Sequence, residues 1–125
     1  MITEALSALN VGAYVLRGNP KTPEEFVNCF ALVTGYNSDY SSIESTDPAE
    51  WGFDVADVFA KAAELEAAQP LKELRAERDR RIAETDWWAS SDLTMTAEQS
   101  AYRQALRDIT ETYSSLEDVV WPVKP

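Results

Sequence analysis

The hydrophobic pattern in the first part of the chain predicts several short elements. Apolar and small residues recur at helical spacing over residues 2–9. Residues 13–17 (AYVLR) form a short run of β-forming residues that ends at a Gly-Asn-Pro sequence, which predicts a strand. Residues 40–45 (YSSIES) alternate well enough for a second strand. We expect these two strands to pair in a small antiparallel sheet.

A capping box at residues 22–25 (TPEE) is the clearest local signal in this part. Thr22 can accept a hydrogen bond from the backbone N–H of Glu25, and the Glu25 side chain can reach back to Thr22. The proline between them loses nothing, because its missing N–H would be unpaired at a helix start. An apolar face follows and predicts a helix that ends at Gly35. A strand over residues 29–34 (CFALVT) is the rival interpretation, since short apolar runs fit either period.

A long helical pattern begins near Asp54. This residue suits an N-cap, and Asp57 in the first turn suits the helix dipole. Pro70 interrupts the pattern, so residues 54–70 and 71–85 form either two helices or one long, bent helix. The apolar stripe of the first part consists of Val55, Val58, Phe59, Ala62 and Leu65.

Residues 71–85 present an apolar face with an arginine in its middle. Leu71, Leu74 and Ile82 share the face, and Arg78 projects from it. An arginine there must extend its guanidinium to solvent or pair with a carboxylate. We expect a structural ion pair or a contact with a binding partner, and the carboxylates that suit the ion pair are those of Asp86, Asp92 and Asp108.

A second capping box, residues 96–99 (TAEQ), starts the last helix. The connection before it is short, which predicts an antiparallel helix pair with the helix over residues 71–85. Arg103 and Arg107 are expected on the flank of the last helix, beside an apolar face made of Tyr102, Ala105, Leu106, Ile109 and Tyr113.

Three tryptophans accompany this helix pair. Trp87 and Trp88 are adjacent, so both cannot point the same way. We expect Trp87 to be wedged where the pair closes and Trp88 to be partly exposed, as a favoured kind of interface anchor. The extended segment at residues 119–123 should pack Trp121 against the helix pair.

Together these elements predict an α+β fold that is mostly helical. A small N-terminal antiparallel sheet with helices comes first, and an antiparallel C-terminal helix pair follows. We divide the chain into an N-terminal α+β region, residues 1–70, and a C-terminal helical-hairpin region, residues 71–125, within one compact domain. A length of 125 residues and an apolar fraction of 45% are sufficient for a real core.

Composition narrows the function classes. The net charge of −11 opposes binding to duplex nucleic acid or to anionic membranes, so neither is expected as a partner. Histidine is absent, and no cluster of metal ligands, phosphate-binding loop or nucleophile with a base appears, which argues against an enzyme, a metal and a cofactor. The single cysteine, Cys29, falls at a core-like position. No signal peptide and no apolar run long enough to span a membrane is evident, so an intracellular site is expected.

Five sequence blocks follow one another in the C-terminal part of the chain: LRAERDRRIAETDW (74–87), LT (93–94), TAEQ (96–99), YRQALRDI (102–109) and VVWP (119–122). Their order and spacing resemble the phage tail assembly chaperone family over residues 71–122. Two positions depart from the family pattern: Ser90-Ser91 precedes Asp92 where a Leu-Pro is usual, and Thr110 stands where a proline is usual. These departures concern the loops around the helices.

The resemblance implies a non-enzymatic protein that binds a phage tail or tail-fibre protein during virion assembly, in the host cytoplasm. A homo-oligomer and retention in the virion as a structural subunit stay open. The net charge of −11 alone motivates a further alternative, an acidic mimic of nucleic acid that acts as an inhibitor. Tryptophan and arginine carry interface energy disproportionately. For this reason the candidate partner-binding residues are Arg78, Trp88, Arg103, Arg107 and Trp121. The rival interpretation places the tryptophans in the core and pairs the arginines with surface acids.

Overall fold

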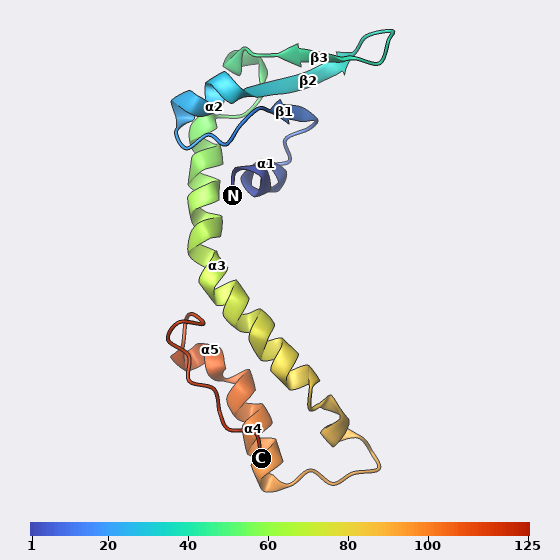
Figure 1. Cartoon of the computed structure of the whole chain (residues 1–125), viewed down its shortest axis with the longest axis vertical. Helices are drawn as coiled ribbons and strands as arrows, with labels where there is room; N and C mark the ends of the chain where they lie inside the picture. Colours follow the sequence, from blue (N-terminus) through green and yellow to red (C-terminus); the bar gives the residue numbers. More distant parts are fainter. The chain divides into compact units, whose positions relative to one another are not determined.

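The computed structural model of the protein describes all residues, 1–125. The chain forms two compact units, Met1–Glu66 and Ala67–Pro125. The predicted α+β fold, mostly helical, is confirmed. The helices and strands labelled in Figure 1 are α1 (Ile2–Ala8), β1 (Tyr14–Leu16), α2 (Pro23–Cys29), β2 (Phe30–Tyr36), β3 (Ser42–Ser45), α3 (Val55–Ala83), α4 (Ala97–Arg107) and α5 (Ile109–Thr112). Two 3₁₀ turns, η1 (Pro48–Glu50) and η2 (Asp86–Ala89), precede and follow α3.

The sheet of the N-terminal unit is antiparallel, with strand order β1-β2-β3. In the central strand, Leu32 lies opposite Tyr14 of β1 on one side and opposite Ser45 of β3 on the other. The expected direct pairing of residues 13–17 with residues 40–45 is therefore wrong. The reason is that the chain after α2 supplies a third strand, which separates them and pairs with both.

Helix α2 ends at Cys29, so the predicted helix that continues to Gly35 is wrong and the rival strand is correct. Thr22 Oγ1 accepts from the Glu25 N–H at 3.2 Å as expected, whereas the Glu25 carboxylate accepts from the Lys21 N–H instead of that of Thr22. These residues form a strand rather than a continued helix because their backbone groups pair with two neighbouring strands. Phe30 still enters the core in this conformation.

Aromatic rings form the centre of the N-terminal core. The Phe30 ring centroid lies 4.9 Å from that of Phe26 and 4.7 Å from that of Trp51. Trp51 is buried after turn η1, and its indole N–H donates to the Ser45 carbonyl at 2.9 Å. Leu6 of α1 and Val58 of α3 complete the cluster. The sequence pattern around Trp51 carries no signal for this central position, which arises from contacts between distant segments.

Helix α3 runs through Pro70 without interruption, so one long helix is correct and two separate helices are not. It starts as predicted, with the Asp54 carboxylate accepting from the Ala56 N–H at 2.9 Å. Pro70 has no N–H to donate to the carbonyl of Glu66, the last residue of the N-terminal unit. Strong helix formers on both sides offset the missing bond. No helix of the protein, α3 included, combines the length and apolar character needed to cross a membrane.

The C-terminal unit contains the predicted helix pair, formed by the last turns of α3 and by α4 (Figure 1). The capping box at the start of α4 is complete: Thr96 Oγ1 accepts from the Gln99 N–H at 3.1 Å, and Gln99 Oε1 accepts from the Thr96 N–H at 2.9 Å. The core of this unit consists of Trp88, Tyr102 and Leu106, with Ile82, Met95 and Trp121 packed against it.

Candidate functional site

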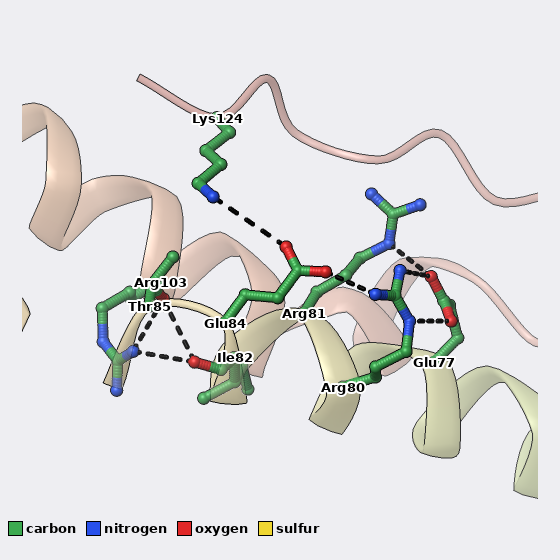
Figure 2. Close-up of polar contacts among 8 residues, drawn as sticks. All are labelled: Glu77, Arg80, Arg81, Ile82, Glu84, Thr85, Arg103 and Lys124. Atoms are coloured by element: carbon green, nitrogen blue, oxygen red, sulfur yellow. Dashed lines mark hydrogen bonds and ion pairs between the residues drawn. The ribbon is translucent and has the colours of Figure 1, made fainter. Parts of the chain in front are cut away.

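Arg103 closes the helix pair. Its side chain is only 8% exposed, although it carries a full charge. Nη1 donates to the Ile82 carbonyl at 3.1 Å and to Thr85 Oγ1 at 2.8 Å, as Figure 2 shows, while Nη2 donates to Asp86 Oδ1 at 3.1 Å. One guanidinium thus joins α4 to the last turn of α3 and to the start of η2.

The partners of Arg103 explain why an arginine is buried here. The last carbonyl groups of an α-helix have no partner within the helix, and a cation near them is favourable. Arg103 supplies such a cation to the Ile82 carbonyl. Thr85, which is fully buried, accepts from Arg103 and donates to the same carbonyl. The expected place of Arg103 on the helix flank is therefore wrong, because the end of α3 draws its side chain inward.

The two adjacent tryptophans take opposite positions, as expected, but in reversed roles. Trp88 is 5% exposed and belongs to the core, whereas Trp87 is 63% exposed. The wedge expected at Trp87 is thus formed by Trp88. The 3₁₀ turn η2 decides the outcome, because it turns Trp88 toward Tyr102, with ring centroids 6.1 Å apart, and leaves Trp87 outside.

Arg78 and Arg107 take no part in this cluster. Arg78 pairs with its neighbour Asp79 at 2.9 Å. The predicted carboxylate partners are wrong for Arg78, since an adjacent acid is the nearest one and Asp86 is engaged by Arg103. Arg107 is exposed, and its contact within the chain is a hydrogen bond of 3.4 Å to Gln104.

Two arginines, Arg80 and Arg81, lie between two acids, Glu77 and Glu84, at the C-terminal end of α3 and just beyond it (Figure 2). Glu77 pairs with Arg80 at 2.7 Å and with Arg81 at 2.9 Å, and Arg80 also pairs with Glu84. The hydrogen bond from Arg80, with that from Arg81 as a lesser cause, lowers the pKa of Glu77 from 4.5 to about 2. Glu77 in turn raises the pKa of Arg80. The network engages the Arg81 side chain within α3 and the side chain of Glu84, the residue after it.

The segment of residues 119–125, which we call the strap, lies beside this network. The Arg81 guanidinium carbon lies 4.2 Å from the ring centroid of Trp121, a cation–π contact. Lys124 Nζ lies 3.9 Å from Glu84 Oε2, as in Figure 2, and 5.9 Å from the Trp88 ring centroid. The predicted packing of Trp121 against the helix pair is confirmed.

We predict a pH dependence of stability from the Glu77 network. Because folding lowers the pKa of Glu77, its ion pairs stabilise the protein fully above about pH 4.5 and lose their effect as the pH falls toward about 2. Glu77 is partly exposed, so the effect at neutral pH should stay below about 1 kcal/mol. Denaturant titrations of the native protein and of Glu77→Gln, from pH 7 to pH 2, should give unfolding free energies that converge over this range.

Loss of the cationic partners provides the matched control for this prediction. An Arg80→Ala/Arg81→Ala variant should lose the same pH-dependent contribution as Glu77→Gln, because either change removes the ion pairs. A difference between the native protein and Glu77→Gln that persists unchanged at pH 2 would contradict the assignment.

No group of three or more His, Cys, Asp and Glu side chains lies close enough together to hold a metal ion. The thiol of Cys29 is half-buried and forms no disulfide. The Ser45 hydroxyl donates to Glu50, a local contact beside Trp51 in the N-terminal unit.

Among the five candidate residues, three lie in one neighbourhood of the C-terminal unit. Trp88 and Trp121 share the same cluster, and Arg103 binds the chain at residues 82–86, just before Trp88. Arg78 and Arg107 lie outside it. The exposed tryptophan, Trp87, was missed as a candidate, and only the geometry of the turn η2 distinguishes it from Trp88.

Residues 71–125 match the family model described as phage tail assembly chaperone protein. The resemblance inferred over residues 71–122 is thereby confirmed, and residues 1–70 lie outside the match. No curated protein and no solved structure is significantly similar to the chain. The matched segment falls within the C-terminal unit, Ala67–Pro125, which contains the helix pair, the Arg103 contacts and the strap.

Proposed function

We propose that this chain, whose C-terminal unit matches the phage tail assembly chaperone family, is a non-enzymatic chaperone that binds a tail or tail-fibre protein. The observation that carries the proposal is the match over residues 71–125. The chaperone covers an apolar or strand-edge surface of its client in the host cell until assembly is complete. The match implies a protein partner, and the net charge of −11 disfavours a nucleic-acid or membrane partner.

The contact surface that we propose lies on the connection between α3 and α4. Trp87 and Leu93 are both exposed in this connection, at 63% and 50%. Exposed Trp and Arg side chains are frequent sources of interface energy, and Arg107 is exposed on α4 of the same unit. Trp88 and Arg103, both buried, support the surface from inside. Of the five candidates, Arg78 and Arg107 keep a direct contact role, Trp121 packs against the core of the unit, and Trp87 takes the place of Trp88.

Co-expression with the tail-fibre protein of the same phage tests the proposed function. Size exclusion followed by mass spectrometry should show a fibre protein that becomes soluble and assembles only when this chain is present. A complex that survives into mature particles would instead make the chain a structural subunit of the virion. An equally insoluble fibre protein with no co-elution would refute client binding.

A variant of the exposed Trp87 extends this experiment to a single residue of the proposed contact surface. Trp87→Ala should weaken the complex with the fibre protein by about 30-fold, as expected for loss of an interface hot spot. Its fold should be unchanged because the side chain contributes little to the core. Tyr36→Ala is the matched control, since Tyr36 is an aromatic residue of similar exposure (65%) in the N-terminal unit. Equal effects of the two variants on affinity would contradict the role of Trp87.

A further inference from the structure

The strap, residues 119–125, is bound by its side chains alone. It is extended, and no hydrogen bond joins it to the rest of the chain. Val120 and Val123 are exposed, at 69% and 90%, so only part of the strap faces the helix pair. A segment without backbone hydrogen bonds and with few buried side chains opens at low free-energy cost.

The surface beneath the strap is built independently of it. Arg81 is held by Glu77 at 2.9 Å within α3, and Glu84, the residue that follows α3, is held by Arg80. The buried Trp88 adds an aromatic ring that the core keeps in place. These groups, Arg81, Glu84 and Trp88, form what we call the seat. Because its side chains are fixed by the helix and the core, the seat stays formed when the strap leaves.

The strap itself shows which chemistry the seat accepts. The Arg81 guanidinium covers the face of an aromatic ring, that of Trp121. The Glu84 carboxylate and the Trp88 ring receive a cation, that of Lys124. An aromatic residue followed three positions later by a lysine or arginine, in an extended segment, therefore complements the seat in shape and charge.

We propose that the seat is a peptide-binding site of the chaperone and that the strap occupies it in the absence of a partner. The partner is an extended segment of the tail protein with an aromatic residue and, three positions later, a cation. This inference rests on the proposed function for the identity of that partner. The site itself rests only on the contacts of Arg81, Glu84 and Trp88.

Competition by the strap lowers the apparent affinity of the seat for a partner segment. A segment joined to its own binding site has an effective concentration of roughly millimolar, so a free peptide at micromolar concentration competes poorly. The apparent affinity falls in proportion to the fraction of molecules whose seat is open. Release of the strap should therefore strengthen binding of a peptide added in trans, by about tenfold for an open fraction of roughly one tenth.

Fluorescence anisotropy with a labelled peptide of residues 117–125 (EDVVWPVKP) tests the site on the full chain. The peptide should bind Trp121→Ala about tenfold more tightly than it binds the native protein, because the variant strap no longer competes. A peptide with alanine in place of its tryptophan should not bind. Adding Arg81→Ala to Trp121→Ala should remove most of the binding, since the cation that covers the ring is gone.

A milder variant keeps the proposal testable where Trp121→Ala destabilises the unit. Lys124→Glu leaves Trp121 in the core and places two acids, at 124 and Glu84, against each other. It should tighten peptide binding by a few-fold. Circular dichroism verifies that each variant is folded. Folded variants that bind the peptide no better than the native protein does would overturn the proposal.

Light scattering separates a foreign partner from a second copy of this chain. A Trp121→Ala monomer that binds the peptide supports a seat for a foreign segment, whereas native dimers that dissociate in this variant would make strap exchange between copies the correct description. Peptide binding without client co-elution would retain the seat and refute the proposed function. Client co-elution without peptide binding would refute the seat and retain the proposed function.

Discussion

Replacing Trp88 with alanine is expected to lower the free energy of unfolding of the C-terminal unit by about 3–5 kcal/mol. The Trp88 side chain is 5% exposed and packs against Tyr102 and Leu106, so its removal leaves a large cavity in a small core. Loss of the ring also removes one side of the seat for Lys124. Chemical denaturation followed by circular dichroism measures the change, and amide hydrogen exchange shows whether residues 67–125 are the part affected.

Trp87→Ala is the matched control, because it removes the same side chain from the adjacent position. Trp87 is 63% exposed, and substitutions at such positions change stability by about 0.5 kcal/mol or less. Similar destabilisation by the two variants would mean that the turn η2 does not hold the tryptophans as described. Together with the client-binding experiment, the pair separates the residue that supports the surface from the residue that contacts the partner.

Loss of Arg103 should produce the second large effect. Arg103→Ala removes three hydrogen bonds to the last turn of α3 and the start of η2, those to the Ile82 carbonyl, Thr85 Oγ1 and Asp86. Thr85 is fully buried and would lose its donor, and the carbonyl would keep only its contacts within the chain segment 82–85. We expect a destabilisation of about 2–4 kcal/mol, measured by denaturant titration.

Two further substitutions distinguish geometry from charge at this position. Arg103→Lys keeps the charge but cannot present the two-pronged donor that reaches Thr85 and Asp86 together, so it should recover less than half of the loss. Arg107→Ala, four residues further along the same helix, should be nearly neutral because Arg107 is exposed. A fully stable Arg103→Lys variant would show that charge alone suffices.

Both expected effects concern the support of the site rather than its surface. The buried ring of Trp88 and the guanidinium of Arg103 hold the connection between α3 and α4 in place from inside. Trp87 and Leu93 project from that connection. A client-binding defect in Trp88→Ala or Arg103→Ala would therefore arise through loss of the fold, whereas one in Trp87→Ala would arise at the contact itself. Stability measured beside affinity separates the two cases.

Signals that act over a few residues were sufficient to predict most elements and the family resemblance. Both helix starts at Thr22 and Thr96 were correct, because a capping residue and its partner lie within one turn. The apolar stripe of α3 and the packing of Trp121 followed from periodicity and from the apolar character of the strap. The order of the C-terminal blocks pointed to the family whose model matches residues 71–125.

Only the tertiary structure decided the features that depend on distant parts of the chain. Residues 30–36 became the central strand because two other strands offered backbone partners, which an isolated apolar run does not reveal. Arg103 turned inward because the end of α3 presents the Ile82 carbonyl and a buried threonine to it. Trp88 rather than Trp87 entered the core because the turn η2 sets the directions of their side chains. Local preference determines where helices and strands begin, but packing between separate segments determines which side chains are buried and which remain free to bind.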